Sequence, residues 1–258
     1  MKKTFFFTLL IFCTLSVPAI HALFPVPPGD TVAVSKNLIK TNITSALIRN
    51  YSLQYERILS RSVSAGVTVR VMPVSGIPYA DNLIRWFDVT DPEAQDIIET
   101  VNVGNFTITP ELRFYTGKKR YGRGFYFALY YRYGQYTFDN AFLPYDTEAG
   151  NEIKFNTTGN ASSHTGGFMI GAQWALGKHM CLDWWILGPH FGVSKGDILG
   201  LPSAPLSRED QQNIKDDLND IDIPMFEQTV NVSSDKVSMV FDGPWGGIRA
   251  GLSLGVRF

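Results

Sequence analysis

The C-terminal stretch from Gly247 to Phe258 alternates strictly between apolar and small or charged residues. One face carries Ile248, Ala250, Leu252, Leu254, Val256 and Phe258, and the other carries Arg249, Gly251, Ser253, Gly255 and Arg257. A period of two predicts a β-strand. The uncharged apolar face and the polar face of small residues and arginines suit a wall with lipid outside and a narrow interior. We therefore expect the closing strand of an outer-membrane barrel.

The same pattern recurs through the chain. In 105–115, for example, Glu111 and Arg113 share one face, and Phe106 and Ile108 lie on the other. The expected fold is an all-β, antiparallel, up-and-down transmembrane barrel, and its eight strands satisfy the even number typical of such barrels. The predicted strands are about 32–43, 51–58, 62–72, 105–115, 125–137, 164–176, 181–193 and 245–258.

The N-terminus has the features of a secretory signal peptide at residues 1–22. Lys2 and Lys3 precede the apolar run from Phe5 to Leu15, and small residues lead to a cleavage site after Ala22. The apolar run is too short for a membrane-spanning helix, which needs about 20 residues. We expect residues 23–258 to form one outer-membrane β-barrel domain.

Composition excludes several other classes. The formal net charge of −1 gives no basic footprint for nucleic acid. After removal of the leader, Cys181 is the remaining cysteine, so no intramolecular disulfide is expected. The acidic run Asp216–Asp222 lacks the ligand spacing of a calcium loop. We expect no catalytic residue, no cofactor-binding residue, no cofactor and no metal site.

Connection lengths differ between the two ends of the predicted barrel. Short turns join strands at one end, whereas long connections such as 139–163 and 194–244 lie at the other, as in outer-membrane barrels. Helices are expected in the long loops at about 91–101 and 208–221, where capping residues precede apolar stripes. These stripes either cover the barrel mouth or pack against each other, or they form a surface for a protein partner, and the sequence leaves these alternatives open.

Charged residues on the polar faces are expected to point into the lumen. Because an isolated buried charge is costly, they should form a paired network that closes the lumen to ions. Aromatic residues near the strand ends are expected to form interfacial girdles. The inward charges are Lys40, Glu56, Arg70, Glu111, Arg113, Arg132, Asp183, Arg249 and Arg257, and the girdle residues are Tyr115, Tyr121, Phe125, Trp174, Trp184, Trp245 and Phe258.

A secreted, lipocalin-like ligand-binding barrel is the main alternative architecture, because it has eight alternating strands with the apolar face inward. Alternation alone cannot distinguish inside from outside. The polar faces contain glycines such as Gly66, Gly171 and Gly255 where a water-exposed surface would carry Lys and Glu. This composition favours a crowded interior, and therefore a membrane barrel over a lipocalin-like one.

A lipid A-modifying outer-membrane enzyme, an acyltransferase or a deacylase, is the alternative function. Its candidate residues are His164 with Ser162 or Ser163, and His190 with Ser194. A Ser-His pair needs hydrogen-bond contact and a third orienting group. Neither cluster has an acid partner in the sequence, so we expect no enzyme activity.

Four segments carry a family resemblance. They are 39–44 (IKTNIT), 51–57 (YSLQYER), 182–188 (LDWWILG) and 251–258 (GLSLGVRF). With these segments the chain resembles a family of small, uncharacterised outer-membrane β-barrel proteins, a domain of unknown function. The resemblance implies an OmpA/OmpX-like architecture, location in the bacterial outer membrane and no established activity.

The expected role is therefore structural or interactive. We expect a monomeric barrel that contacts outer-membrane lipid, with its extracellular loops open to a protein partner and with no nucleic-acid ligand.

Overall fold

The computed structural model describes residues 35–117, 121–147, 150–220 and 225–258. The predicted signal peptide and the start of the first predicted strand lie outside these residues. Within them the chain is mostly β-structure, with nine strands in one sheet. The strands are β1 (Asn37–Asn42), β2 (Tyr51–Ile58), β3 (Val63–Gly76), β4 (Asn102–Tyr115), β5 (Gly124–Asp146), β6 (Glu152–Leu176), β7 (Met180–Pro202), β8 (Glu227–Val232) and β9 (Val237–Arg257).

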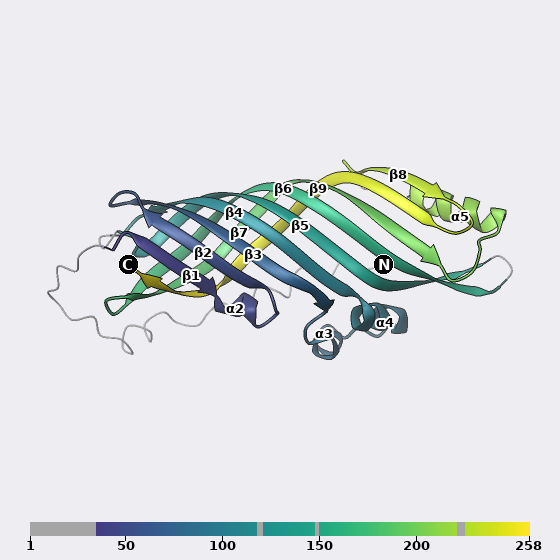
Figure 1. Ribbon diagram of the computed structural model, residues 1–258, viewed down its shortest axis with the longest axis horizontal. Helices are drawn as coiled ribbons and strands as arrows, with labels where there is room; N and C mark the ends of the chain where they lie inside the picture. Colours follow the sequence, from purple (N-terminus) through teal and green to yellow (C-terminus); the bar gives the residue numbers. More distant parts are fainter. Residues whose placement is uncertain (1–34, 118–120, 148–149, 221–224) are drawn as a thin grey trace.

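Eight of the strands form a closed antiparallel ring. Strands β1 to β6 each pair with the next strand along the chain, β7 pairs with β9, and β9 pairs with β1 (Figure 1). The closing register runs from Leu38 opposite Arg257 to Asn42 opposite Ser253. The eight predicted antiparallel strands are therefore confirmed, and the C-terminal alternating segment is the strand that closes the ring.

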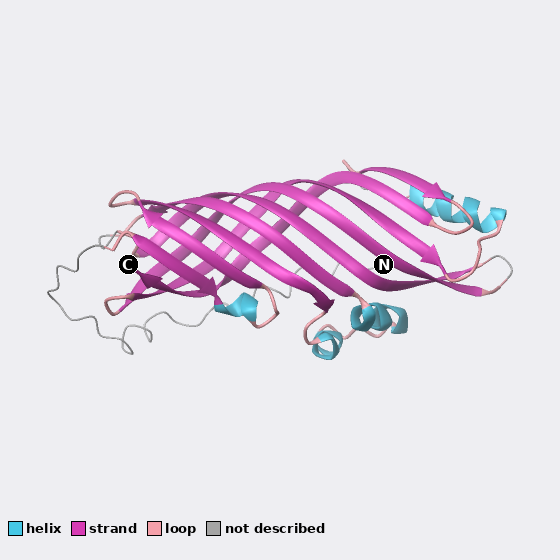
Figure 2. Cartoon of the chain, in the orientation of Figure 1, coloured by secondary structure: helices cyan, strands magenta, loops and turns pink. Residues whose placement is uncertain are grey.

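Four strands are much longer than the sequence pattern predicts. Strands β5, β6, β7 and β9 continue past the ring as a sheet extension, to which β8 adds an edge strand (Figure 2). Most of the segment 139–163 and parts of 194–244, both predicted as long connections, are therefore strands. The alternation is hidden there because polar and apolar residues mix on the outer face of the extension. A register shift between Phe138 and Ala141 also interrupts β5.

Short helices lie beside the ring and the extension: α2 (Ile43–Ala46), α3 (Ala80–Trp86), α4 (Pro92–Thr100) and α5 (Arg208–Asn219). The predicted loop helices at 91–101 and 208–221 correspond to α4 and α5. Ser207 caps α5, with its Oγ accepting a hydrogen bond from the Asp210 amide. Ile214 of α5 packs with Phe155 of the extension, so the extension itself covers the stripe of α5. No helix of the described residues is long and apolar enough to cross a membrane.

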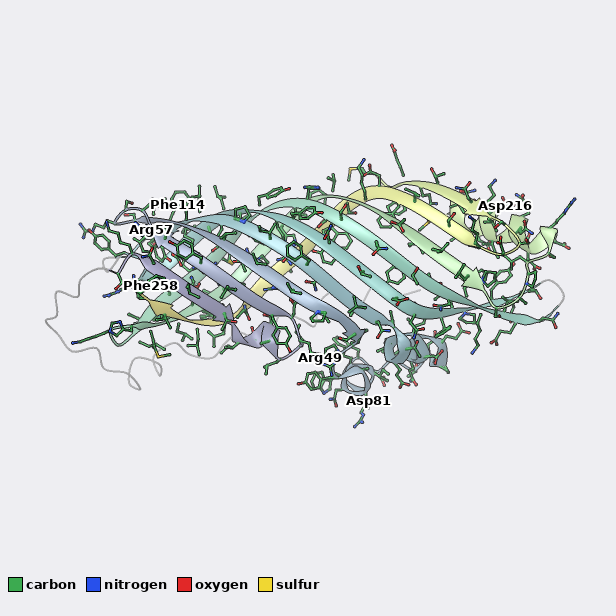
Figure 3. The ribbon with its side chains drawn as sticks, viewed as in Figure 1. Arg49, Arg57, Asp81, Phe114, Asp216 and Phe258 are labelled. Carbon is green, nitrogen blue, oxygen red and sulfur yellow. The ribbon has the colours of Figure 1, made fainter. Side chains whose placement is uncertain are left out.

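The two faces of the ring wall have opposite polarity. Large apolar side chains point outward, and Leu129 and Ile248 expose 60% and 68% of their surface. Charged side chains point inward, where Lys40 and Glu56 expose 1% and 0%. Phe114 and Phe258 lie on the outside at the end of the molecule opposite Asp216 of α5 (Figure 3).

The outer face changes from apolar to polar side chains along one row of paired residues. Gln135, Ser162, Lys195 and Asp242 face each other across β5, β6, β7 and β9. The ammonium of Lys195 lies 2.7 Å from the Asp242 carboxylate, and this hydrogen bond raises the pKa of Lys195. In the next row toward the ring, apolar Val193 and Pro244 replace the charged pair. The continuous apolar outer surface thus belongs to the ring, and beyond this row polar residues alternate with isolated apolar ones such as Leu201 and Val240.

Candidate functional site

A buried ion-pair network fills the ring interior. Lys40 Nζ lies 2.5 Å from Glu56 Oε2 and 2.7 Å from Asp183 Oδ2, and it donates to Gln173 Oε1 at 2.8 Å. The side chains of Lys40, Glu56 and Asp183 are all fully buried. These residues come from β1, β2, β6 and β7, so the network ties together strands that are distant in the ring order.

Arg113 of β4 is the second cation at the centre of this network. Its Nε lies 2.5 Å from Glu111 Oε1, and its Nη1 lies 2.7 Å from Asp183 Oδ2. Arg249 of β9 adds a longer contact of 3.4 Å to Glu111 Oε2. Three cations therefore face three carboxylates, and their charges balance inside the ring.

Hydroxyl, amide and indole groups satisfy the remaining carboxylate oxygens. Tyr115 Oη donates to Glu56 Oε1 at 2.7 Å, and Tyr126 Oη donates to Asp183 Oδ1 at 2.8 Å. Ser64 Oγ also donates to Glu56, and Trp185 Nε1 donates to Asp183 at 3.1 Å. Each of the eight ring strands contributes at least one side chain to this network.

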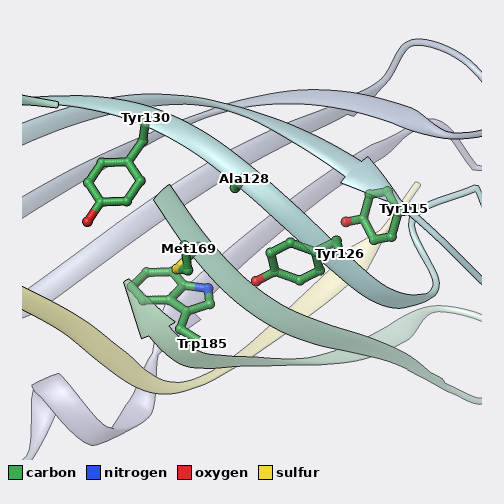
Figure 4. Packing of buried hydrophobic residues seen from close by; sticks show 6 residues of the cluster. All are labelled: Tyr115, Tyr126, Ala128, Tyr130, Met169 and Trp185. Atoms are coloured by element: carbon green, nitrogen blue, oxygen red, sulfur yellow. The ribbon is translucent and has the colours of Figure 1, made fainter. Parts of the chain in front are cut away.

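An aromatic layer lies beside the ion pairs. Figure 4 shows the side chains of Tyr126, Met169 and Trp185 converging inside the ring, with Tyr115 and Tyr130 on either side. The guanidinium of Arg113 lies 4.4 Å from the ring centroid of Tyr126. Cation–π contacts of this kind favour a desolvated arginine. Ion pairs and aromatic rings together fill this part of the interior.

Inward glycines make room for these bulky side chains. A Cβ at Gly171 would lie 2.3 Å from the Tyr126 ring, and one at Gly255 would lie 2.3 Å from Lys40 Cγ. The glycines on the polar faces therefore face a crowded interior, as the sequence predicted, and not solvent.

The structure places all nine predicted inward charges on the inner face, but it divides them into two groups. Six form the balanced network: Lys40, Glu56, Glu111, Arg113, Asp183 and Arg249. The other three form no ion pair among the described residues. Of these, Arg257 donates from Nη2 to the Tyr121 carbonyl at 2.6 Å, and Arg70 and Arg132 lie nearer the extension.

Sequence reasoning missed several uncharged members of the network and misplaced two aromatic residues. The girdle interpretation is wrong for Tyr115, which is 3% exposed and faces Glu56. Trp245 also faces inward, with its ring centroid 4.9 Å from that of Tyr136. The alternation of faces within a strand could have shown the inward position of Tyr115, because Tyr115 shares a face with Glu111 and Arg113.

The candidate Ser-His clusters do not assemble. His164 lies on the outer face, where its Nδ1 contacts the Tyr131 hydroxyl, whereas His190 lies inside, 3.3 Å from the Tyr130 hydroxyl. Ser162 Oγ donates to the Lys195 carbonyl, and Ser194 Oγ donates to the Gly243 carbonyl. In the described part of the chain the two histidines are therefore separated by the ring wall, and neither contacts a serine hydroxyl. These residues also contain no group of three His, Cys, Asp or Glu side chains able to hold a metal ion.

Comparison with known proteins identifies a family for this chain. Residues 9–192 match the family described as "Protein of unknown function (DUF3575)". The chain belongs to the DUF3575 family. The match includes every charged residue of the balanced network except Arg249 of β9, namely Lys40, Glu56, Glu111, Arg113 and Asp183.

No curated protein and no solved structure matches the chain. The DUF3575 match therefore carries no activity over to it, and the arguments about function below depend on the geometry of the ring.

Proposed function

We propose that this DUF3575 protein is a bacterial outer-membrane β-barrel that anchors its sheet extension outside the cell and has a structural or interaction role without catalysis. The observation that carries the proposal is the polarity of the ring wall. Apolar side chains cover its outside, and a balanced network of charges fills its inside. This arrangement is the reverse of a water-soluble lipocalin-like barrel.

The outer apolar surface supports membrane insertion. Phe125, Phe127, Leu129 and Tyr131 follow one another on the outer face of β5, each more than 40% exposed. Soluble monomers rarely expose contiguous apolar patches above a few hundred Å². A closed ring also leaves no unpaired strand edge within the bilayer, where an unsatisfied backbone group would be costly.

The length of the apolar zone supports the same proposal. On β5 it runs from Phe125 to Tyr133 and ends at the polar row that begins with Gln135. A membrane-crossing β-strand needs about 9–11 residues. The polar row would then mark the outer membrane surface, and the extension with α5 would stand in the external medium.

The buried network supports a structural barrel over a channel. Eight strands enclose an interior that side chains can fill, and here the ion pairs, Tyr126 and Trp185 occupy it. The network also joins strands across the ring. We infer that it holds the barrel closed while the extension presents a surface to other molecules.

The proposal is tested by expressing the full chain in a bacterial host, fractionating the envelope and refolding the chain in detergent. It predicts outer-membrane fractionation, heat-modifiable gel mobility, a β-rich circular dichroism spectrum and no conductance in planar bilayers. Monodisperse folding in plain buffer would overturn it in favour of a soluble barrel. A change in lipid A acylation that requires His164 or His190 would instead establish the enzyme.

A further inference from the structure

Two inward arginines lie outside the balanced network. Arg70 of β3 and Arg132 of β5 face the interior toward the extension, and neither forms an ion pair among the described residues. Arg132 is only 8% exposed, whereas Arg70 is partly exposed. This part of the interior therefore carries an excess of positive charge.

These arginines lie near Arg249, and the three repel one another. Arg70 interacts unfavourably with both Arg132 and Arg249, and Arg132 also repels Arg249. Arg132 and Arg249 also repel a positive charge on the inward His190. Arg249 keeps its 3.4 Å contact to Glu111, but no carboxylate of the described residues pairs with Arg70 or Arg132. Such a group of cations is unfavourable unless a further negative group joins it.

Hydrogen-bond donors in this region lack acceptors. The buried Nε atoms of Arg132 and Arg249 have no hydrogen-bond partner among the described residues, although Arg249 is 97% buried. The buried hydroxyls of Thr68 and Ser163, on the inner faces of β3 and β6, are also without a partner. A buried donor without an acceptor is unfavourable in folded proteins because it loses its hydrogen bonds to water.

Planar guanidinium forks match the geometry of phosphate, sulfate and carboxylate oxygens. We propose that Arg70, Arg132 and Arg249 form a binding site for an oxyanionic group, a phosphate above all, which enters from the extension end past the partly exposed Arg70. The bound oxygens accept from the guanidinium groups and offset their mutual repulsion. The phosphate belongs either to a soluble molecule or to a lipid headgroup.

The test titrates inorganic phosphate into the full chain at constant ionic strength, in detergent or in plain buffer, whichever keeps the chain folded. Thermal unfolding and calorimetry report binding. We expect a saturable rise in the unfolding temperature, and we expect Arg132→Gln and Arg70→Gln each to weaken the affinity about tenfold or more. Arg208→Gln, at the exposed start of α5, is the matched control and leaves the affinity unchanged.

Stability measured without phosphate distinguishes a loss of binding from a folding defect. Without phosphate, Arg132→Gln should be at least as stable as the parent chain because it relieves repulsion. If that variant fails to fold, the partly exposed Arg70→Gln carries the test. No saturable effect of phosphate, or an equal effect in both variants and the control, would overturn the proposal.

The source of the anion is distinguished by a parallel titration with short-chain phosphatidic acid in neutral micelles. Tighter binding of this lipid, lost in Arg132→Gln, assigns a lipid headgroup, whereas equal or weaker binding assigns a soluble phosphate. Folding without detergent would refute the membrane proposal and leave this test intact.

Discussion

Replacing Lys40 by methionine isolates the contribution of the central ion pairs. Lys40 contacts two of the three buried carboxylates, Glu56 at 2.5 Å and Asp183 at 2.7 Å, and its side chain is fully buried. Methionine has a similar length but no charge, so Lys40→Met leaves three carboxylates facing only two cations. Removing one partner of a buried ion pair typically costs about 3–5 kcal/mol. We expect the free energy of unfolding to fall by that amount.

A second substitution tests whether charge imbalance is the cause. Lys40→Met combined with Glu56→Gln leaves two cations facing two carboxylates, and glutamine keeps an oxygen for the Tyr115 hydroxyl. The double variant should therefore be more stable than the sum of the single changes predicts, by about 1–3 kcal/mol. Lys154→Met is the control, because Lys154 is 58% exposed and lies 3.8 Å from Glu152. It should change stability by less than about 0.5 kcal/mol.

The assay is urea unfolding of the full chain in detergent or lipid vesicles, followed by tryptophan fluorescence and by gel mobility of unheated samples. The fluorescence of Trp185 reports directly on the buried network, because its indole donates a hydrogen bond to Asp183. The reasoning is refuted if Lys40→Met costs no more than Lys154→Met. It is also refuted if the double variant loses the full sum of the two single effects.

Three further predictions follow from the two faces of the wall and its packing. Gly171→Ala should destabilise the fold by about 1–3 kcal/mol in the same urea assay, because its Cβ would lie 2.3 Å from the Tyr126 ring. Gly166→Ala is the control and should be neutral, because a Cβ there meets no atom within 4 Å. Phe127→Arg, on the outer apolar face, should weaken folding into vesicles by about 2–4 kcal/mol. Thr137→Arg, which points outward beyond the polar row of the same strand, should have little effect. Equal losses of folding free energy in the two variants would contradict the assignment of the membrane zone. The Cys181 thiol is fully buried, so it should react with a maleimide only after unfolding in urea, and rapid labelling of the folded chain would show that the interior is open.

The ring strands could be predicted because in most of them one face is largely apolar, although the outer face of β2 also carries Arg57. In β2, predicted and observed here as Tyr51–Ile58, exposed and buried positions alternate without interruption. The same parity placed Glu56, Arg113 and Asp183 inside. Parity gives the face on which a residue lies, but it gives neither the height of a residue in the ring nor its partner across the interior. The pairing within the balanced network, and the finding that Arg70 forms no ion pair in the described part of the chain, therefore required the structure.

The extension could not be predicted because the physical signal is absent there. Beyond Gln135, outward residues such as Asn160 and Lys195 are polar. The inner face packs on α5 through a short apolar set that includes Ile153 and Phe155, and this set is too short to give a clear period of two in the sequence. Strand β8 is short, and β9 supplies its pairing partner. The helices α4 and α5 were predicted because a capping residue such as Ser207 acts locally, whereas the short helices α2 and α3 were not predicted.

The central claim is that the apolar face of the ring contacts lipid, and fluorescence quenching at two positions of β5 tests it directly. In a Cys181→Ala background, a label is placed by Phe127→Cys or Thr137→Cys, and the chain is folded into vesicles. We predict that brominated lipid quenches the label at position 127 and iodide does not, with the reverse at position 137. Iodide quenching at both positions, with no effect of brominated lipid at position 127, would contradict the claim.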